Sequence, residues 1–156
     1  MPTATTLRFP SGYGKATRTI GWEEVRARLE AAPAYWLSTA RLDGRPHVVP
    51  VDGIWVDDVW WYGGAPETVH IRAVESNPQA VMHLPDPMQA VIVEGVVRRV
   101  APAAELAQRM ADVANEKYAH YGLKNDAATY ASALGLFPTR VLAWSAFPAD
   151  ATRFQF

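Results

Sequence analysis

Short apolar runs rich in β-branched and aromatic side chains dominate the middle of the chain. Five such runs lie between residues 34 and 100, separated by turn signals, and two more follow residue 139. Val, Ile, Thr, Tyr and Trp favour the half-buried surface of a pleated sheet. The pattern therefore predicts a mainly β protein of six to seven strands, at residues 34–41, 46–55, 59–64, 79–84, 89–100, 139–147 and 151–156.

Helical periodicity occupies the intervals between these runs. The first amphipathic segment begins at Gly21 and is stopped by Pro33. The longest one follows the fifth strand and carries an apolar stripe at helical spacing. The predicted helical segments are residues 21–32, 66–77, 102–121 and a short piece at 127–134.

Several positions inside the predicted strands carry turn or edge signals. Asp43-Gly44 is a strong hairpin signal. Pro50 cannot donate to a ladder, so it is expected at an edge, at a bulge or beside a ligand. Gly95 predicts a bulge or sharp bend of the kind that closes a barrel. The run 59–64 lacks polar alternation, so both of its faces should be covered. The barrel interior is the expected cover of one face, and a second subunit is a candidate for the other.

Length and composition narrow the class of protein. We expect one domain over residues 1–156, with residues 1–18 as an irregular N-terminal arm. The chain has no Cys, which excludes disulfides and thiolate metal sites and favours a cytoplasmic location. A net charge of −1 argues against nucleic acid as a partner, and no apolar run is long enough for a membrane helix. No His and carboxylate spacing predicts a metal site.

Candidate chemistry lies at the junction between the third run and the following helix. Thr68, His70 and Arg72 stand where small anionic groups are often held. The Arg guanidinium is a fork of donors that suits phosphate, and the Thr hydroxyl can cap the helix. The alternative is an ordinary solvated helix face.

Four stretches together resemble the pyridoxamine 5′-phosphate oxidase-like superfamily of split β-barrels. They are WLSTARLDGRPHVVPV, WWYGGAPETVHIRAVESNP, AVIVEGVV and PTRVLAWSAF followed by TRFQF. More narrowly, they are similar to the bacterial flavin- and deazaflavin-dependent oxidoreductases. The order and spacing of these stretches carry the resemblance, and no single stretch identifies one activity.

The resemblance implies a homodimer with the cofactor in a groove between subunits. It places Thr39 and the Pro50-Val51-Asp52 strand near the cofactor ring, and Tyr62 and Gly63 on the approach to its phosphate. Family members commonly bind the phosphate through a Lys and an Arg two residues apart. In this chain His70 stands at the Lys position and Arg72 is retained. Because His is only partly charged near neutral pH, phosphate affinity is expected to be lower or to depend on pH.

Four further residues are candidates for the substrate side of such a groove. His47 and Trp55 lie on the second run, and Trp144 and Arg153 lie near the C-terminus. Each has an ordinary alternative: an exposed or cross-strand His, core or interface packing for Trp, and a surface ion pair for Arg.

These observations predict an oxidoreductase that uses FMN or the deazaflavin coenzyme F-420. It would transfer hydride to or from a flat, conjugated small molecule, with the cofactor supplying the redox chemistry. No catalytic residue is assigned, and the sequence does not separate the two cofactors. The alternatives are a non-catalytic protein that stores or senses a flavin-type ligand and, more remotely, a barrel that serves only as an interaction module.

Overall fold

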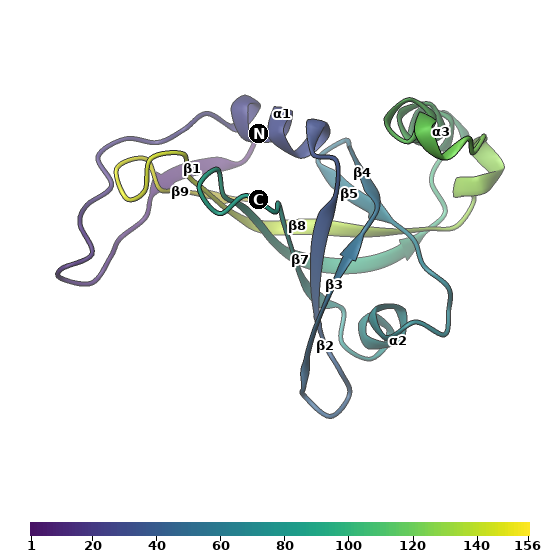
Figure 1. Cartoon of the computed structure of the whole chain (residues 1–156), viewed down its shortest axis with the longest axis horizontal. Helices are drawn as coiled ribbons and strands as arrows, with labels where there is room; N and C mark the ends of the chain where they lie inside the picture. Colours follow the sequence, from purple (N-terminus) through teal and green to yellow (C-terminus); the bar gives the residue numbers. More distant parts are fainter.

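Nine antiparallel strands and three helices make up the fold in a computed structural model that describes residues 1–156 (Figure 1). The strands are β1 Thr3–Thr6, β2 Tyr35–Ala40, β3 Pro46–Val51, β4 Gly53–Val56, β5 Val59–Tyr62, β6 Gln79–His83, β7 Val91–Val100, β8 Ala133–Ala143 and β9 Thr152–Gln155. The helices are α1 Trp22–Ala31, α2 Val69–Ser76 and α3 Ala104–Lys117, with short 3-10 turns at Ala119–Tyr121 and Ala127–Tyr130.

One bent strand closes the barrel. The ladder runs β1-β9-β8-β7-β6-β2-β3, and β5 pairs with both β8 and β4. Because β3 leads into β4 across the single residue Asp52, this segment joins β2 on one side of the bend and β5 on the other. The next residue must be Gly53, since a Cβ there would lie 2.3 Å from Nε1 of Trp60 and 2.8 Å from a backbone oxygen. The expected split β-barrel is confirmed.

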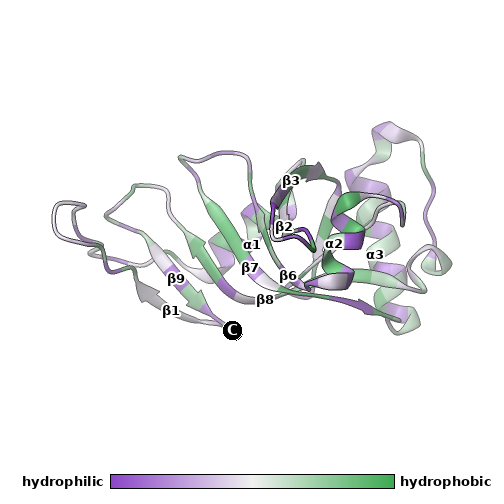
Figure 2. Cartoon of the chain, turned by 90° about the horizontal axis from the view of Figure 1, so that it is seen from below, coloured by the Kyte–Doolittle hydropathy of each residue, from purple (hydrophilic) through white to green (hydrophobic).

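The core fills the barrel and continues under two helices. The largest fully buried side chains come from β2, β5, β6 and α1, among them Tyr35, Trp60, Met82 and Leu29. A second cluster packs Trp61 and Ile54 of the β4–β5 hairpin against Met110 of α3. Figure 2 shows α2 and α3 at one end of the sheet and β1 and β9 at the other. All four residues of β5 are buried, as its unbroken apolar run predicts, and α3 of the same chain covers the second face.

Four expectations about the elements need correction. The N-terminal arm is not wholly irregular, because β1 pairs with β9 at the end of the sheet. The single strand predicted at 46–55 is broken at Asp52 into β3 and β4. The helical piece predicted at 127–134 is a short 3-10 turn, and β8 begins at Ala133 because this strand extends to pair along the whole of β7. Six to seven strands is thus an underestimate of nine.

Two predicted backbone features are confirmed. The β7–β8 register shifts between Glu94 and Gly95, where a bulge was expected. A Cβ at Gly95 would lie 2.2 Å from the Phe137 carbonyl oxygen, so the close approach of the two strands requires glycine. β3 is an edge strand, and it precedes the bend. An edge strand accommodates Pro46 and Pro50.

None of the helices combines the length and apolar character needed to span a bilayer.

Candidate functional site: a gap beside β3

The bend at Asp52 leaves one side of β3 without a partner strand. On the other side of the bend, Gly53 pairs with Tyr62, the last residue of β5. The chain then leaves the sheet through Gly63 and Gly64 and enters α2, whose first residue is Val69. α2 contacts both β2 and β3. We call the region between the free edge of β3, the two glycines and the start of α2 the gap beside β3.

His70 faces the barrel from the first turn of α2. Only 8% of its surface is exposed, and its ring lies 6.4 Å from that of Tyr62. Gly64 permits this position, because a Cβ there would lie 2.5 Å from His70 Nε2. Burial lowers the pKa of His70; the Gly63 backbone opposes this shift, and His47 adds to it. His70 therefore stands in the gap as a neutral ring whose buried Nε2 has no hydrogen-bond partner.

Arg72 points in a different direction from His70, because residues two apart on a helix are rotated by roughly 200°. Its side chain is exposed and lines a cavity of about 540 Å³ between α2 and the β2–β3 turn. We call this the arginine cavity; its other lining residues include Arg41, Asp43 and Ser76. His70 and Arg72 thus do not present one joint face to a ligand.

The arginine cavity carries two arginines without ion pairs, although the charge of Arg41 acts on the Asp43 carboxylate of the same wall. Neither Arg41 nor Arg72 forms an ion pair, and the buried Nε of Arg41 has no hydrogen-bond partner. Asp43 pairs instead with Arg45, 2.7 Å away. Two free guanidinium groups on one cavity form a donor set for an anion such as phosphate.

A second cavity of about 370 Å³ lies on the other side of the Gly63-Gly64 segment. Three predicted residues, Asp52, Tyr62 and Gly63, line it together. We call it the tyrosine cavity, since its remaining wall includes Tyr118, Tyr121 and Tyr130.

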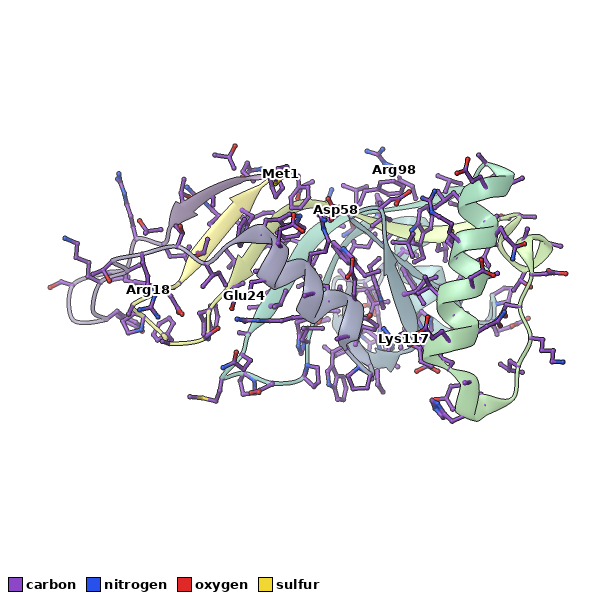
Figure 3. All side chains as sticks on the ribbon, turned by 90° about the horizontal axis from the view of Figure 1, so that it is seen from above. Met1, Arg18, Glu24, Asp58, Arg98 and Lys117 are labelled. Atoms are coloured by element: carbon purple, nitrogen blue, oxygen red, sulfur yellow. The ribbon has the colours of Figure 1, made fainter.

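Lys117 reaches from the end of α3 towards α1, and its Nζ lies 2.5 Å from the Tyr35 hydroxyl (Figure 3). Burial lowers the pKa of Lys117 to about 8, against the opposing charge of Asp52.

The other predicted cofactor residues occupy varied surroundings. Thr39 is buried on β2, and its Oγ1 has no hydrogen-bond partner. Pro50 is exposed and Val51 is buried on β3. Thr68 precedes α2, but its Oγ1 donates to the Ala65 carbonyl at 2.7 Å and does not cap the helix.

The four substrate-side candidates are not brought together. His47 is half-buried on β3 and faces the gap region, since its charge acts on His70. Trp55 belongs to the core, with its ring 6.3 Å from that of Trp22. Trp144 donates to the Pro87 carbonyl at 3.2 Å, and Arg153 is exposed on β9, near the far end of the ladder from β3. Within one chain only His47 lies close to the gap.

Two functional candidates escaped the sequence analysis, Arg41 and Arg99. Arg41 lies two residues beyond Thr39 and directly follows the end of β2, so continued strand alternation predicts it on the same side as Thr39. Arg99 lines the tyrosine cavity from β7, and only the pairing of β7 with β8 brings it there.

Residues 22–145 match the family described as pyridoxamine 5′-phosphate oxidase, and the chain belongs to this family. The resemblance drawn from the sequence is thereby confirmed. No curated protein matches the chain.

Solved structures extend the comparison. A conserved hypothetical protein from Mycobacterium tuberculosis is 18% identical with a TM-score of 0.66, covering 84% of this chain and 89% of that one. A heme binding protein from Mycobacterium smegmatis is 19% identical with a TM-score of 0.66, covering 87% and 59%. An F-420 reductase is 22% identical with a TM-score of 0.56, covering 85% and 98%. At these identities the likeness shows a shared fold.

The buried neutral His70 predicts a pH-dependent stability. Its pKa is lowered in the folded state, so between that value and the unfolded value of about 6.5 the unfolded chain binds more protons. The stability that neutral His70 contributes to the folded state is fully present above about pH 6.5 and is lost as the pH falls through the pKa of His70 in the folded state. Urea unfolding from pH 8 to 5 should show this loss, and His70→Gln should reduce the slope. The exposed His120, replaced by Gln, is the control; equal slopes for wild type and His70→Gln would contradict the assignment.

Proposed function

We propose that this protein is an oxidoreductase that binds a phosphate-bearing flavin-type cofactor, FMN or F-420, in the gap beside β3. The observation that supports this most strongly is the pair of arginines without ion pairs, Arg41 and Arg72, that lines one cavity on α2. The family to which the chain belongs and the shared fold with an F-420 reductase support the same proposal.

The residues present fit such a group. Buried polar atoms without partners, which are rare in folded proteins, occur on His70, Tyr62 and Thr39, all from the set that the resemblance selected. Gly63 has no atom within 4 Å of a would-be Cβ, so backbone alone faces open space there. Phosphate has an arginine donor set, and the flat ring system has a free strand edge on which to lie.

Each residue then has a role that follows from its surroundings. Arg72 and Arg41 bind the phosphate through charge-assisted hydrogen bonds. Tyr62 keeps its phenol proton, because burial raises the pKa of the phenol well above the usual range, so its hydroxyl is able to donate to the ligand. His70, neutral near pH 7, offers its free Nε2 to the ligand without adding a charge. When bound, FMN or F-420 supplies hydride transfer, and the chain supplies orientation and exclusion of water.

A non-catalytic binding protein is the second candidate function. The specific observation in its favour is the neutral, buried His70 at the position where relatives commonly carry a charged Lys. With this cation absent, the phosphate is held less firmly, which suits an exchangeable ligand. The solved heme binding protein shows that this fold also occurs in a protein described by its ligand alone.

The outer face of β2 and β3 supports a homodimer. Alternate residues on these paired strands place Trp36 opposite Pro50 and Ser38 opposite Val48 on the side away from the barrel. Trp36 is 37% exposed and Val48 is 52% exposed, and the adjoining His83 stacks on Trp36. A contiguous apolar sheet face of this kind marks an interaction surface. A second copy packed on it would close the groove beside β3.

Arg72→Ala should weaken binding of FMN or F-420 by about 1–3 kcal/mol, the range for a charge-assisted hydrogen bond. Arg41→Ala should act in the same direction. The control is Arg8→Ala, which removes an exposed arginine from the N-terminal arm. Fluorescence titration of each cofactor measures the dissociation constants, and an unchanged constant for Arg72→Ala would refute the phosphate assignment.

The same preparations separate an enzyme from a binder. Reduced cofactor is followed spectroscopically in the presence of a panel of flat conjugated acceptors. Oxidation that depends on both protein and acceptor identifies an oxidoreductase. Tight cofactor binding without turnover on the whole panel favours the storage or sensing function.

Val48→Asp should convert the dimer into a monomer, because it places a charge on the apolar face of β3. Val48→Thr, which keeps the shape without a charge, is the matched control. Sedimentation velocity measures the outcome at fixed protein concentration. A wild-type monomer, or a dimer that tolerates the aspartate, would argue against this face as the interface.

A further inference from the structure

The tyrosine cavity has a wall that is held in place before any ligand binds. Its outer wall is the segment that follows α3, and Asn115 of the helix clamps this segment through Asn125. The Asn125 amide donates to Asn115 Oδ1 at 2.7 Å, and Asn115 Nδ2 donates to the Asn125 carbonyl at 2.9 Å. Asp126 and Thr129 form a reciprocal capping box in the same segment. Such a wall loses little conformational entropy on binding.

Tyr118 fixes the opposite end of this wall to the barrel. Its hydroxyl accepts from the Gly53 amide at 2.9 Å and donates to the Gly53 carbonyl at 2.7 Å. Its ring is stacked on Tyr121, with centroids 5.7 Å apart and planes at 6°. The cavity is thus bordered by rigid aromatic rings, which favour flat ligands.

One charged group on the cavity wall has no partner within the chain. Arg99 is exposed, lines the cavity and forms no ion pair. The hydroxyl of Tyr62, by contrast, is buried in the barrel core and is not exposed to the cavity. A free guanidinium is a fork of donors that suits one carboxylate.

The charges on the cavity wall match a ligand with one acidic group. Arg99 is the only cationic side chain on the wall, and the carboxylate of Asp52 lies on the same wall under the influence of the Lys117 charge. The one free guanidinium therefore suits one carboxylate. Gly63 and Gly64 belong both to this wall and to the edge of the gap beside β3, so a ligand here lies next to the proposed cofactor site.

We propose that the tyrosine cavity binds the substrate, a flat aromatic or conjugated molecule with a single carboxylate held by Arg99. That the ligand is a substrate rests on the proposed function. The chemistry of the ligand rests on the cavity alone.

Isothermal titration of the full chain with three probes tests the chemistry. The probes are 2-naphthoate, its uncharged analogue 2-naphthamide, and the non-aromatic cyclohexanecarboxylate. We expect 2-naphthoate to bind at least about tenfold more tightly than either analogue. The amide lacks the charge-assisted contact, and the cyclohexane ring lacks the contact with the aromatic wall. Equal affinities for naphthoate and naphthamide, or no naphthoate binding up to millimolar concentration, would overturn the proposal.

Two neighbouring arginines provide a matched pair of variants. Arg99→Gln should weaken 2-naphthoate binding about tenfold or more and leave naphthamide unaffected. Arg98→Gln is the control, because Arg98 stacks on Phe137 at 5.2 Å and does not line the cavity. Equal losses in the two variants would show that the effect is general electrostatics, which contradicts a site at Arg99.

Failure of this proposal is distinguishable from failure of the cofactor site. Arg99→Gln should leave FMN affinity within about twofold, and Arg72→Ala should leave naphthoate affinity within about twofold, because the two arginines line different cavities. Loss of naphthoate binding with intact FMN binding in wild type overturns the cavity assignment alone. Naphthoate binding that depends on Arg99 without any FMN or F-420 binding supports the cavity and overturns its role as a substrate site.

Discussion

The bend of one strand at Asp52 is the constraint on which the rest of the structure depends. The β3–β4 segment must pair with β2 before the bend and with β5 after it. Gly53 makes this change of direction possible, because Trp60 and the backbone of β5 occupy the space where a side chain would stand. A barrel closed in this way cannot also pair the outer edge of β3. The fold therefore produces the free strand edge and the adjoining gap together, and the chemistry of the site is built around them.

The two cavities and the buried histidine around the gap differ in charge. The arginine cavity holds two unpaired cations, whereas the position next to it carries a buried histidine whose pKa is lowered. On the other side of the glycine pair, the tyrosine cavity combines one guanidinium, one carboxylate and several phenols. Gly63 and Gly64 have no side chains, so nothing bulkier than backbone stands at this border of the tyrosine cavity. An arrangement of this kind can hold an anionic cofactor tail and a flat acidic ligand at separate places.

Much of the fold could be predicted from the sequence, because local patterns determine it. The unbroken apolar run of β5, the bulge at Gly95 and the edge position of Pro50 each follow from a local rule, and each is confirmed. The errors have a shared physical cause, which is tertiary pairing. β1 forms only because β9 offers an edge, and β8 starts early only because β7 is long enough to pair with it. Neither partner can be read from the segment itself.

The site was predictable in part for the same reason. Asp52, Tyr62 and Gly63 meet on one cavity, and His70 and Arg72 were correctly placed on α2. The arrival of Arg99 from β7 depends on the pairing of β7 with β8, which the sequence does not reveal. Trp144 and Arg153 lie towards the far end of the sheet from β3, which spacing in the sequence does not reveal.

The central claim is that the gap beside β3 is the place where a phosphate-bearing cofactor binds. Hydrogen–deuterium exchange with and without FMN or F-420 tests it most directly. The account predicts slower exchange in two segments on binding, β3 at Pro46–Val51 and the stretch from Gly63 to Arg72, with β1 and β9 unchanged. Protection confined to β1 and β9, or cofactor binding that leaves both predicted segments unprotected, would contradict it.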